Sequence, residues 1–167
     1  MGLFGKKDKG DDAVLTTKKD AISMITKYLK DVEVEYEYNE EHSTFVMGTM
    51  GDDLPILTTL TVSDRVISFR CPLQLKAAPE NYDKVVNALN DINFKLLMGA
   101  FYLDKNAGFI LYEYGFPYNN SKLSEGFFLA ILKMVIDTVD DHDGDLKGLA
   151  ESVPRSETKS TYESMYQ

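Results

Sequence analysis

The sequence predicts an α+β fold in which helices pack on an antiparallel β-sheet. Apolar residues recur at helical spacing near the start, alternate with polar residues through successive short segments, and return to helical spacing twice. Short connections between the alternating segments favour antiparallel neighbours and a meander. The predicted order is α-β-β-β-β-α-β-β-α, and 167 residues are enough to bury one core.

The first predicted helix begins at Thr16 or Thr17 and ends near Asp31. Asp20 follows Thr17 by three residues, which is the spacing of a capping box. Apolar residues within the segment recur every three or four positions, so they share one face. Residues 1–15 consist mainly of Gly, Lys and Asp, and we expect them to form a flexible leader.

Four predicted strands follow this helix. Apolar and mainly acidic residues alternate from Val32 to Asn39, which predicts a half-buried strand with an acidic outer face. Turn-forming residues separate it from three further strands, expected at residues 45–49, 54–62 and 66–73. We expect Pro55 and Pro72 at strand ends or sheet edges, because proline cannot donate a ladder hydrogen bond.

A second helix and a hairpin come next. Pro79 suits the first position of a helix, and Asn93 suits a left-handed cap at its end. The hairpin strands are predicted at residues 94–103 and 108–117, around turn-forming residues 104–107. Because both strands are apolar on both faces, we expect the hairpin in the middle of a layered fold or beneath a subunit contact.

The last predicted helix runs from Ser121 to about Asp141. Its apolar residues cover an arc of roughly 240°, whereas packing on a sheet requires a stripe of only about 100–140°. Residues after Gly144 could fold back over the surplus, or a second subunit could cover it. The candidate partner or dimer interface consists of Leu129, Leu132 and Ile136. We expect one domain over residues 16–151 and a flexible tail over residues 152–167.

Composition narrows the classes of function. The net charge is −9, from 27 acidic and 18 basic residues, which disfavours binding to nucleic acid or to an anionic membrane surface. No apolar stretch reaches the length of about 18 residues that membrane insertion requires. The first residues lack the apolar core of a signal peptide, so we expect a cytoplasmic protein.

The single cysteine, Cys71, excludes an internal disulfide and a cysteine-based zinc site. It precedes Pro72 in a strand-like run, and we expect it to serve as a small buried hydrophobe. The two histidines are too few for the usual metal-ligand set. No Gly-x-Ser-x-Gly, phosphate-loop or dinucleotide motif is present. We therefore expect no enzymatic activity and no cofactor.

The densest acidic run, Asp137–Asp145, shares some features with a calcium-binding loop. If Gly144 takes the sixth position of such a loop, Val139 falls at the first and Ala150 at the twelfth. Two ligand positions then lack a carboxylate, so we predict no specific divalent-metal site there. We expect instead the end of a helix followed by a solvated turn.

Several short segments carry a resemblance to a known family. They are Leu89–Asn93 at the end of the middle helix, Phe101–Asp104 at the start of the hairpin, Pro117 after it, and Asp137–Leu149 with its aspartates and spaced leucines. With the order of elements, they make residues 16–150 resemble the YbjN family, catalogued as bacterial sensory transduction regulators. That family is similar in fold to the class I type III secretion chaperones, which are acidic homodimers that bind extended protein segments. The resemblance implies no catalytic residues.

Residues and resemblance together predict a non-enzymatic protein-binding or regulatory module. The expected partner is another protein or an extended peptide segment, and a homodimer is one arrangement that would cover the last helix. Two alternatives stay open: a structural or assembly subunit that only dimerises, and a small metal-dependent hydrolase that uses the Asp137–Asp145 run.

Overall fold

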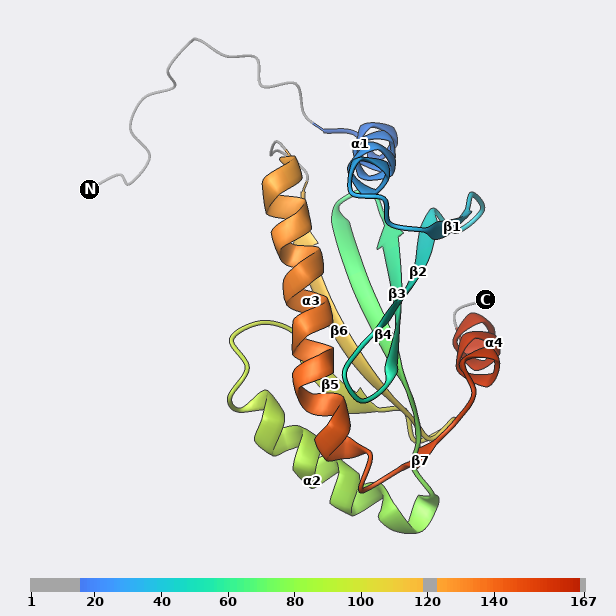
Figure 1. Cartoon of the computed structure of the whole chain (residues 1–167). Helices are drawn as coiled ribbons and strands as arrows, with labels where there is room; N and C mark the ends of the chain where they lie inside the picture. Colours follow the sequence, from blue (N-terminus) through green and yellow to red (C-terminus); the bar gives the residue numbers. More distant parts are fainter. Residues whose placement is uncertain (1–15, 119–122, 166–167) are drawn as a thin grey trace, which may run out of the picture.

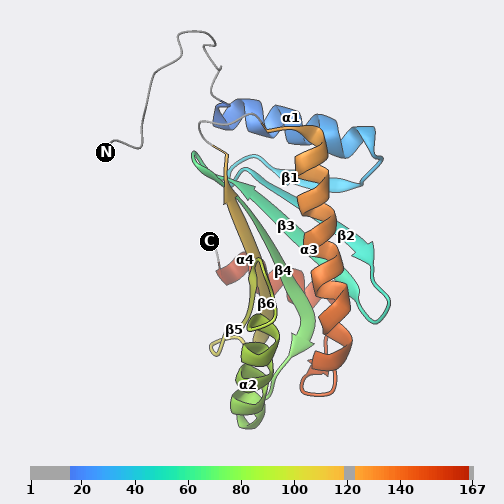
Figure 2. The same cartoon turned by 90° about the vertical axis from the view of Figure 1, so that its left-hand side faces the viewer.

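The computed structural model describes residues 16–118 and 123–165. It confirms the predicted α+β fold: a seven-stranded antiparallel sheet has the strand order β1-β2-β3-β4-β6-β5, and β7 pairs with β4. Helices α1 and α3 cover one face of the sheet, and α4 lies on the other (Figures 1 and 2). The elements are α1 (Lys18–Asp31), β1 (Tyr36–Asn39), β2 (Thr44–Met50), β3 (Pro55–Val62), β4 (Val66–Lys76), a 3-10 turn (Pro79–Asn81), α2 (Tyr82–Asn93), β5 (Ala100–Leu103), β6 (Phe109–Pro117), α3 (Glu125–Leu146), β7 (Glu151–Ser152) and α4 (Arg155–Met165).

Helix α1 begins as predicted, because Thr17 and Asp20 form a complete capping box. The first strand starts at Tyr36 instead of the predicted Val32, because the residues before it close the helix. The backbone N–H groups of residues 32–34 donate to carbonyls in the last turns of α1, and Glu33 adopts a positive φ of 57°. These residues therefore close the helix and cannot pair in the sheet.

Pro72 differs from the prediction, since it lies within β4, between β3 and β6 in the sheet order. The ladder between β3 and β4 ends at Thr59 and Arg70. In this register the next hydrogen-bonded pair would need an N–H from Pro72, which proline lacks. The pairing with β6 then becomes irregular between Pro72 and Lys76. Pro55 is the first residue of β3, as expected.

The hairpin also differs from the prediction. Residues 94–99 form a loop, so β5 is only four residues long and lies at the edge of the sheet. Asn93 is not a left-handed cap: α2 continues to this residue, and Phe94 follows in right-handed helical conformation. Only β6 occupies the interior position that was expected for both strands.

Helix α3 starts after Ser124, whose side chain accepts a hydrogen bond from the N–H of Phe127. The predicted cap, Ser121, lies outside the described residues. The helix continues beyond Asp141 to Leu146 because the buried stripe continues: Val139, Asp143 and Leu146 are all buried. The acidic run is therefore helical, which corrects the expected solvated turn.

Residues expected to form part of a flexible tail include a helix. Strand β7 pairs with the end of β4, and α4 then packs on the face of the sheet opposite α3 (Figure 1). The Nζ of Lys159 lies 2.6 Å from Glu37 Oε2, and the Nζ of Lys76 lies 3.1 Å from Glu157 Oε1. Thr158 is buried. The low apolar content of this segment concealed a helix that ion pairs join to β1 and β4.

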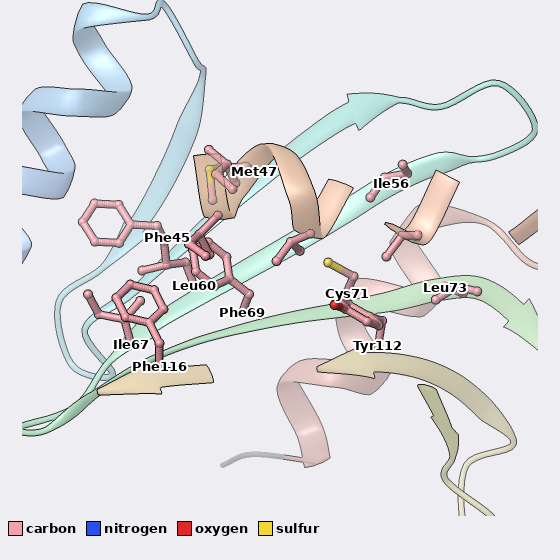
Figure 3. Close-up of a cluster of buried hydrophobic side chains, with 14 of the residues drawn as sticks. Phe45, Met47, Ile56, Leu60, Ile67, Phe69, Cys71, Leu73, Tyr112 and Phe116 are labelled. Carbon is pink, nitrogen blue, oxygen red and sulfur yellow. The ribbon is translucent and has the colours of Figure 1, made fainter. Parts of the chain in front are cut away.

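The core lies between the sheet and the helices α1 and α3. Side chains from β2, β3, β4 and β6 line it, and Figure 3 labels ten of them, among them Phe45, Leu60, Phe69 and Phe116. The helices add Ile25, Leu29, Phe128 and Val135, each with no exposed surface. This packing fixes the position of α3 across the sheet and leaves the edge formed by β5 and β6 for the features described next.

Candidate functional site

Cys71, the single cysteine, lies in the core instead of on the surface. Cys71 is 1% exposed within the core, where Thr58 is its hydrogen-bonding neighbour. Burial raises the pKa of the thiol to about 12, so the sulfur is protonated at neutral pH. This confirms the prediction of a small buried residue. Within residues 16–118 and 123–165, no three His, Cys, Asp or Glu side chains are grouped as metal ligands would be.

An exposed apolar loop is the most unusual surface feature. It joins α2 to β5 at residues 94–99, and we call it the apolar loop. Phe94 is 90% exposed, Leu97 is 98% exposed and Met98 is 43% exposed. Scattered single apolar residues are normal on protein surfaces, but three exposed ones within five positions are unusual. The apolar pattern that predicted a buried strand here is thus presented to solvent.

Three contacts hold the ends of the apolar loop. At its start, the Asn93 side chain accepts from the N–H of Phe101 and donates to the Phe101 carbonyl, each over 2.7 Å. At its end, Gly99 has a φ of 71°, and a Cβ atom at this position would clash with the side chain of Tyr112. The hydroxyl of Tyr112 donates to the carbonyl of Met98 over 3.2 Å. Gly99 was the sequence signal that could have ended the predicted strand.

The base of the apolar loop lies beside α3. The hydroxyl of Tyr112 that contacts Met98 is also 3.9 Å from the sulfur of Met134 on α3. Phe127 lies two turns earlier on the same flank of α3 and is 50% exposed. Its ring packs edge-on against Phe116 of β6, with 5.4 Å between centroids. Sequence reasoning did not single out Phe127.

The predicted interface residues lie elsewhere on α3. Leu132 is 5% exposed and belongs to the core of its own chain. Leu129 and Ile136 are partly buried, and at about 100° per residue they occupy the flank opposite Phe127. The structure therefore brings Leu129 and Ile136 together on one flank and places Leu132 inward. Their role in a dimer or partner contact stays a prediction.

The edge of the sheet next to Phe127 is unpaired among the strands that the structure describes. Strand β5 pairs with β6 only from Ile110 to Glu113, and no described strand pairs with the outer edge of Tyr114–Pro117. The N–H of Tyr118 donates to the carbonyl of Arg65, which directly precedes β4. Backbone groups of successive residues in a strand point to opposite sides, so Gly115 directs its N–H and carbonyl toward the outer edge. Gly115 is exposed. An unpaired edge of this kind can accept an added strand.

Comparison with known proteins identifies the family of the chain and supports its fold. The family model for YbjN, described as "Putative bacterial sensory transduction regulator", matches residues 21–147. The chain therefore belongs to the YbjN family. Its description is that of a regulator, which agrees with a non-enzymatic regulatory module and does not name a reaction.

One similar solved structure is that of YbjN itself, described as "a putative transcription regulator from E. coli". The TM-score is 0.63 at 12% sequence identity, over 77% of this chain and 94% of the other, so the two share a fold. The chain matches no curated protein. None of the described helices combines the length and the hydropathy that a membrane span requires.

Proposed function

We propose that this chain is a non-enzymatic regulatory module that binds an extended segment of a partner protein at the apolar loop and the adjoining edge of β6. The exposure of Phe94 and Leu97 carries the proposal. Burying a Phe or Leu side chain stabilises a complex by roughly 1.5–3 kcal/mol, so these residues can act as anchors. While these side chains are exposed in the free protein, they contribute no such stabilisation.

The unpaired edge of β6 favours a partner segment in extended conformation, because such a segment can pair with it as an added strand. Gly115 offers both a donor and an acceptor, whereas Pro117 offers only its carbonyl, which limits any added strand to a few residues. The net charge of −9 favours partners that are basic around their apolar residues. The similarity of the family to the class I type III secretion chaperones, expected from the sequence, agrees with this mode of binding.

Site-specific photo-crosslinking tests the proposal. A photoreactive amino acid replaces Leu97 in one variant and Met50 in a control variant, since Met50 is 77% exposed at the end of β2. We expect a discrete crosslinked protein from position 97 and none above background from position 50. Mapping the crosslink should place it in an extended, apolar and basic segment of the partner.

Two results would overturn the proposal. Equal crosslinking from both positions would mean that the apolar loop has no selectivity. A crosslink from position 97 to a second copy of this chain alone would favour the structural homodimer, which is the alternative function.

A further inference from the structure

A reciprocal contact joins the β2–β3 turn (residues 51–54) to the C-terminal half of α3. The Oδ1 atom of Asp140 accepts a hydrogen bond from the N–H of Asp52 over 2.7 Å. The same oxygen would clash with a Cβ atom added to Gly51. In return, the Oδ2 atom of Asp53 would clash with a Cβ atom added to Gly144 of α3. Each element thus presses a carboxylate against a glycine of the other.

Asp143 lies buried beside this contact. It is 1% exposed, and its Oδ1 atom has no hydrogen-bond partner among the described residues. The charged groups near it are Asp140 on its own helix, Lys147 directly after that helix, and Asp53 on the turn. Lys147 is shared, because its Nζ lies 4.0 Å from Asp53 Oδ1. The neighbouring His142 packs its ring against Phe101 of β5.

The physical consequence is that a negative charge on Asp143 is unfavourable. Burial removes water from the carboxylate, and Asp140 and then Asp53 add repulsion. The N–H of Gly144 and the charge of Lys147 oppose these effects only in part. Together they raise the pKa of Asp143 from 3.8 to about 6.

We propose that Asp143 is a proton-controlled latch between the β2–β3 turn and α3. When its carboxylate binds a proton, the turn docks against the helix with two negative charges instead of three. When the proton leaves, the third charge repels Asp53 and Asp140 and loosens the contact. The latch is independent of the apolar loop.

The sign of the effect follows from the two pKa values. Because the folded-state pKa lies above 3.8, the folded protein binds the proton more tightly than the unfolded chain does. The contribution of Asp143 to stability is greatest below about pH 4 and is lost as the pH rises through about 6. A rise in pKa of this size corresponds to a change of roughly ten- to a hundredfold in the folding equilibrium constant.

Nuclear magnetic resonance titration of the unmodified protein tests the latch directly. The carboxyl carbon of Asp143 should titrate near pH 6, and the amide of Asp52 should shift with the same midpoint because it bonds to Asp140. Titration of Asp143 near 3.8 would overturn the proposal. So would an Asp52 amide that does not respond at that midpoint.

A pair of variants gives the second test. Asp143→Asn keeps the shape of the side chain but cannot ionise, so its folding equilibrium constant at pH 7.5 should exceed that of the wild type by ten- to a hundredfold. At pH 4 the two proteins should be equal. The control, Asp141→Asn, changes the same charge at an exposed position of α3 and should leave the pH profile unchanged. Parallel profiles for wild type and Asp143→Asn would contradict the latch.

Discussion

The side chain of Asn93 takes the place of a neighbouring strand at the edge of the sheet. Its carboxamide pairs with both backbone groups of Phe101, each over 2.7 Å, and Phe101 is 1% exposed. These are the groups that β5 cannot pair with β6, because they point to the outer edge. We therefore expect Asn93→Ala to destabilise the fold while leaving the apolar core in place.

The magnitude follows from the number of unpaired groups. A buried donor or acceptor left without a partner costs roughly 1–3 kcal/mol. Two such groups are created, but they lie at an edge where water can partly replace the lost partner. We expect a loss of about 2–4 kcal/mol in the free energy of unfolding. Asn93→Asp should lower the free energy of unfolding by less than Asn93→Ala does, since a carboxylate still accepts from the N–H of Phe101. It should still be less stable than the wild type, because the carboxylate repels the carbonyl oxygen of Phe101.

Urea denaturation monitored by circular dichroism measures this loss, provided that the slope with denaturant is unchanged. Asn87→Ala is the matched control, because Asn87 is exposed in the middle of the same helix. Alanine is favoured within helices, so the control should be neutral or slightly stabilising. An Asn93→Ala variant within about 0.5 kcal/mol of this control would refute the strand-substitute role of Asn93.

Two further predictions concern the core and α3. Cys71→Ser should lower the free energy of unfolding by about 1–2 kcal/mol, because a buried hydroxyl replaces the thiol, and should leave partner binding intact; a folded variant that no longer binds would show that the thiol has a function. Simultaneous substitution of Leu129 and Ile136 by Ser should convert a homodimer into a folded monomer if their flank of α3 is an interface. Light scattering with a melting curve decides, and a wild type that is already monomeric at high concentration would exclude that interface.

The sequence predicted most accurately those features that depend on local chemistry. The capping box of Thr17 and Asp20, the meander and the burial of Cys71 all follow from neighbouring residues. The exposure of Phe94 and Leu97 could not be predicted, because apolar residues predict burial whether a partner or the core covers them. Helix α4 is held by ion pairs to strands far away in the sequence, which leave no apolar periodicity to detect.

In the candidate site, too, local features could be predicted from the sequence and contacts between distant segments could not. Leu89–Asn93 and Phe101–Asp104 were recognised as separate segments that resemble a family, but only the structure shows that Asn93 of the first pairs with Phe101 of the second. Likewise, the sequence predicts the end of a helix and a solvated turn over Asp137–Asp145. The burial of Asp143 could not be predicted, because it depends on the β2–β3 turn, which is distant in the sequence and packs against the helix.

The central claim is that the apolar loop binds a partner segment. Its most direct test is the affinity of the crosslinked partner segment, made as a synthetic peptide, for the wild type and for a variant carrying Phe94→Ser and Leu97→Ser together. Both side chains are already exposed, so the variant should keep the stability of the wild type. Calorimetric titration should show a loss of affinity of at least about tenfold, since burying either side chain contributes roughly 1.5–3 kcal/mol. Equal affinities for the two proteins would contradict the account.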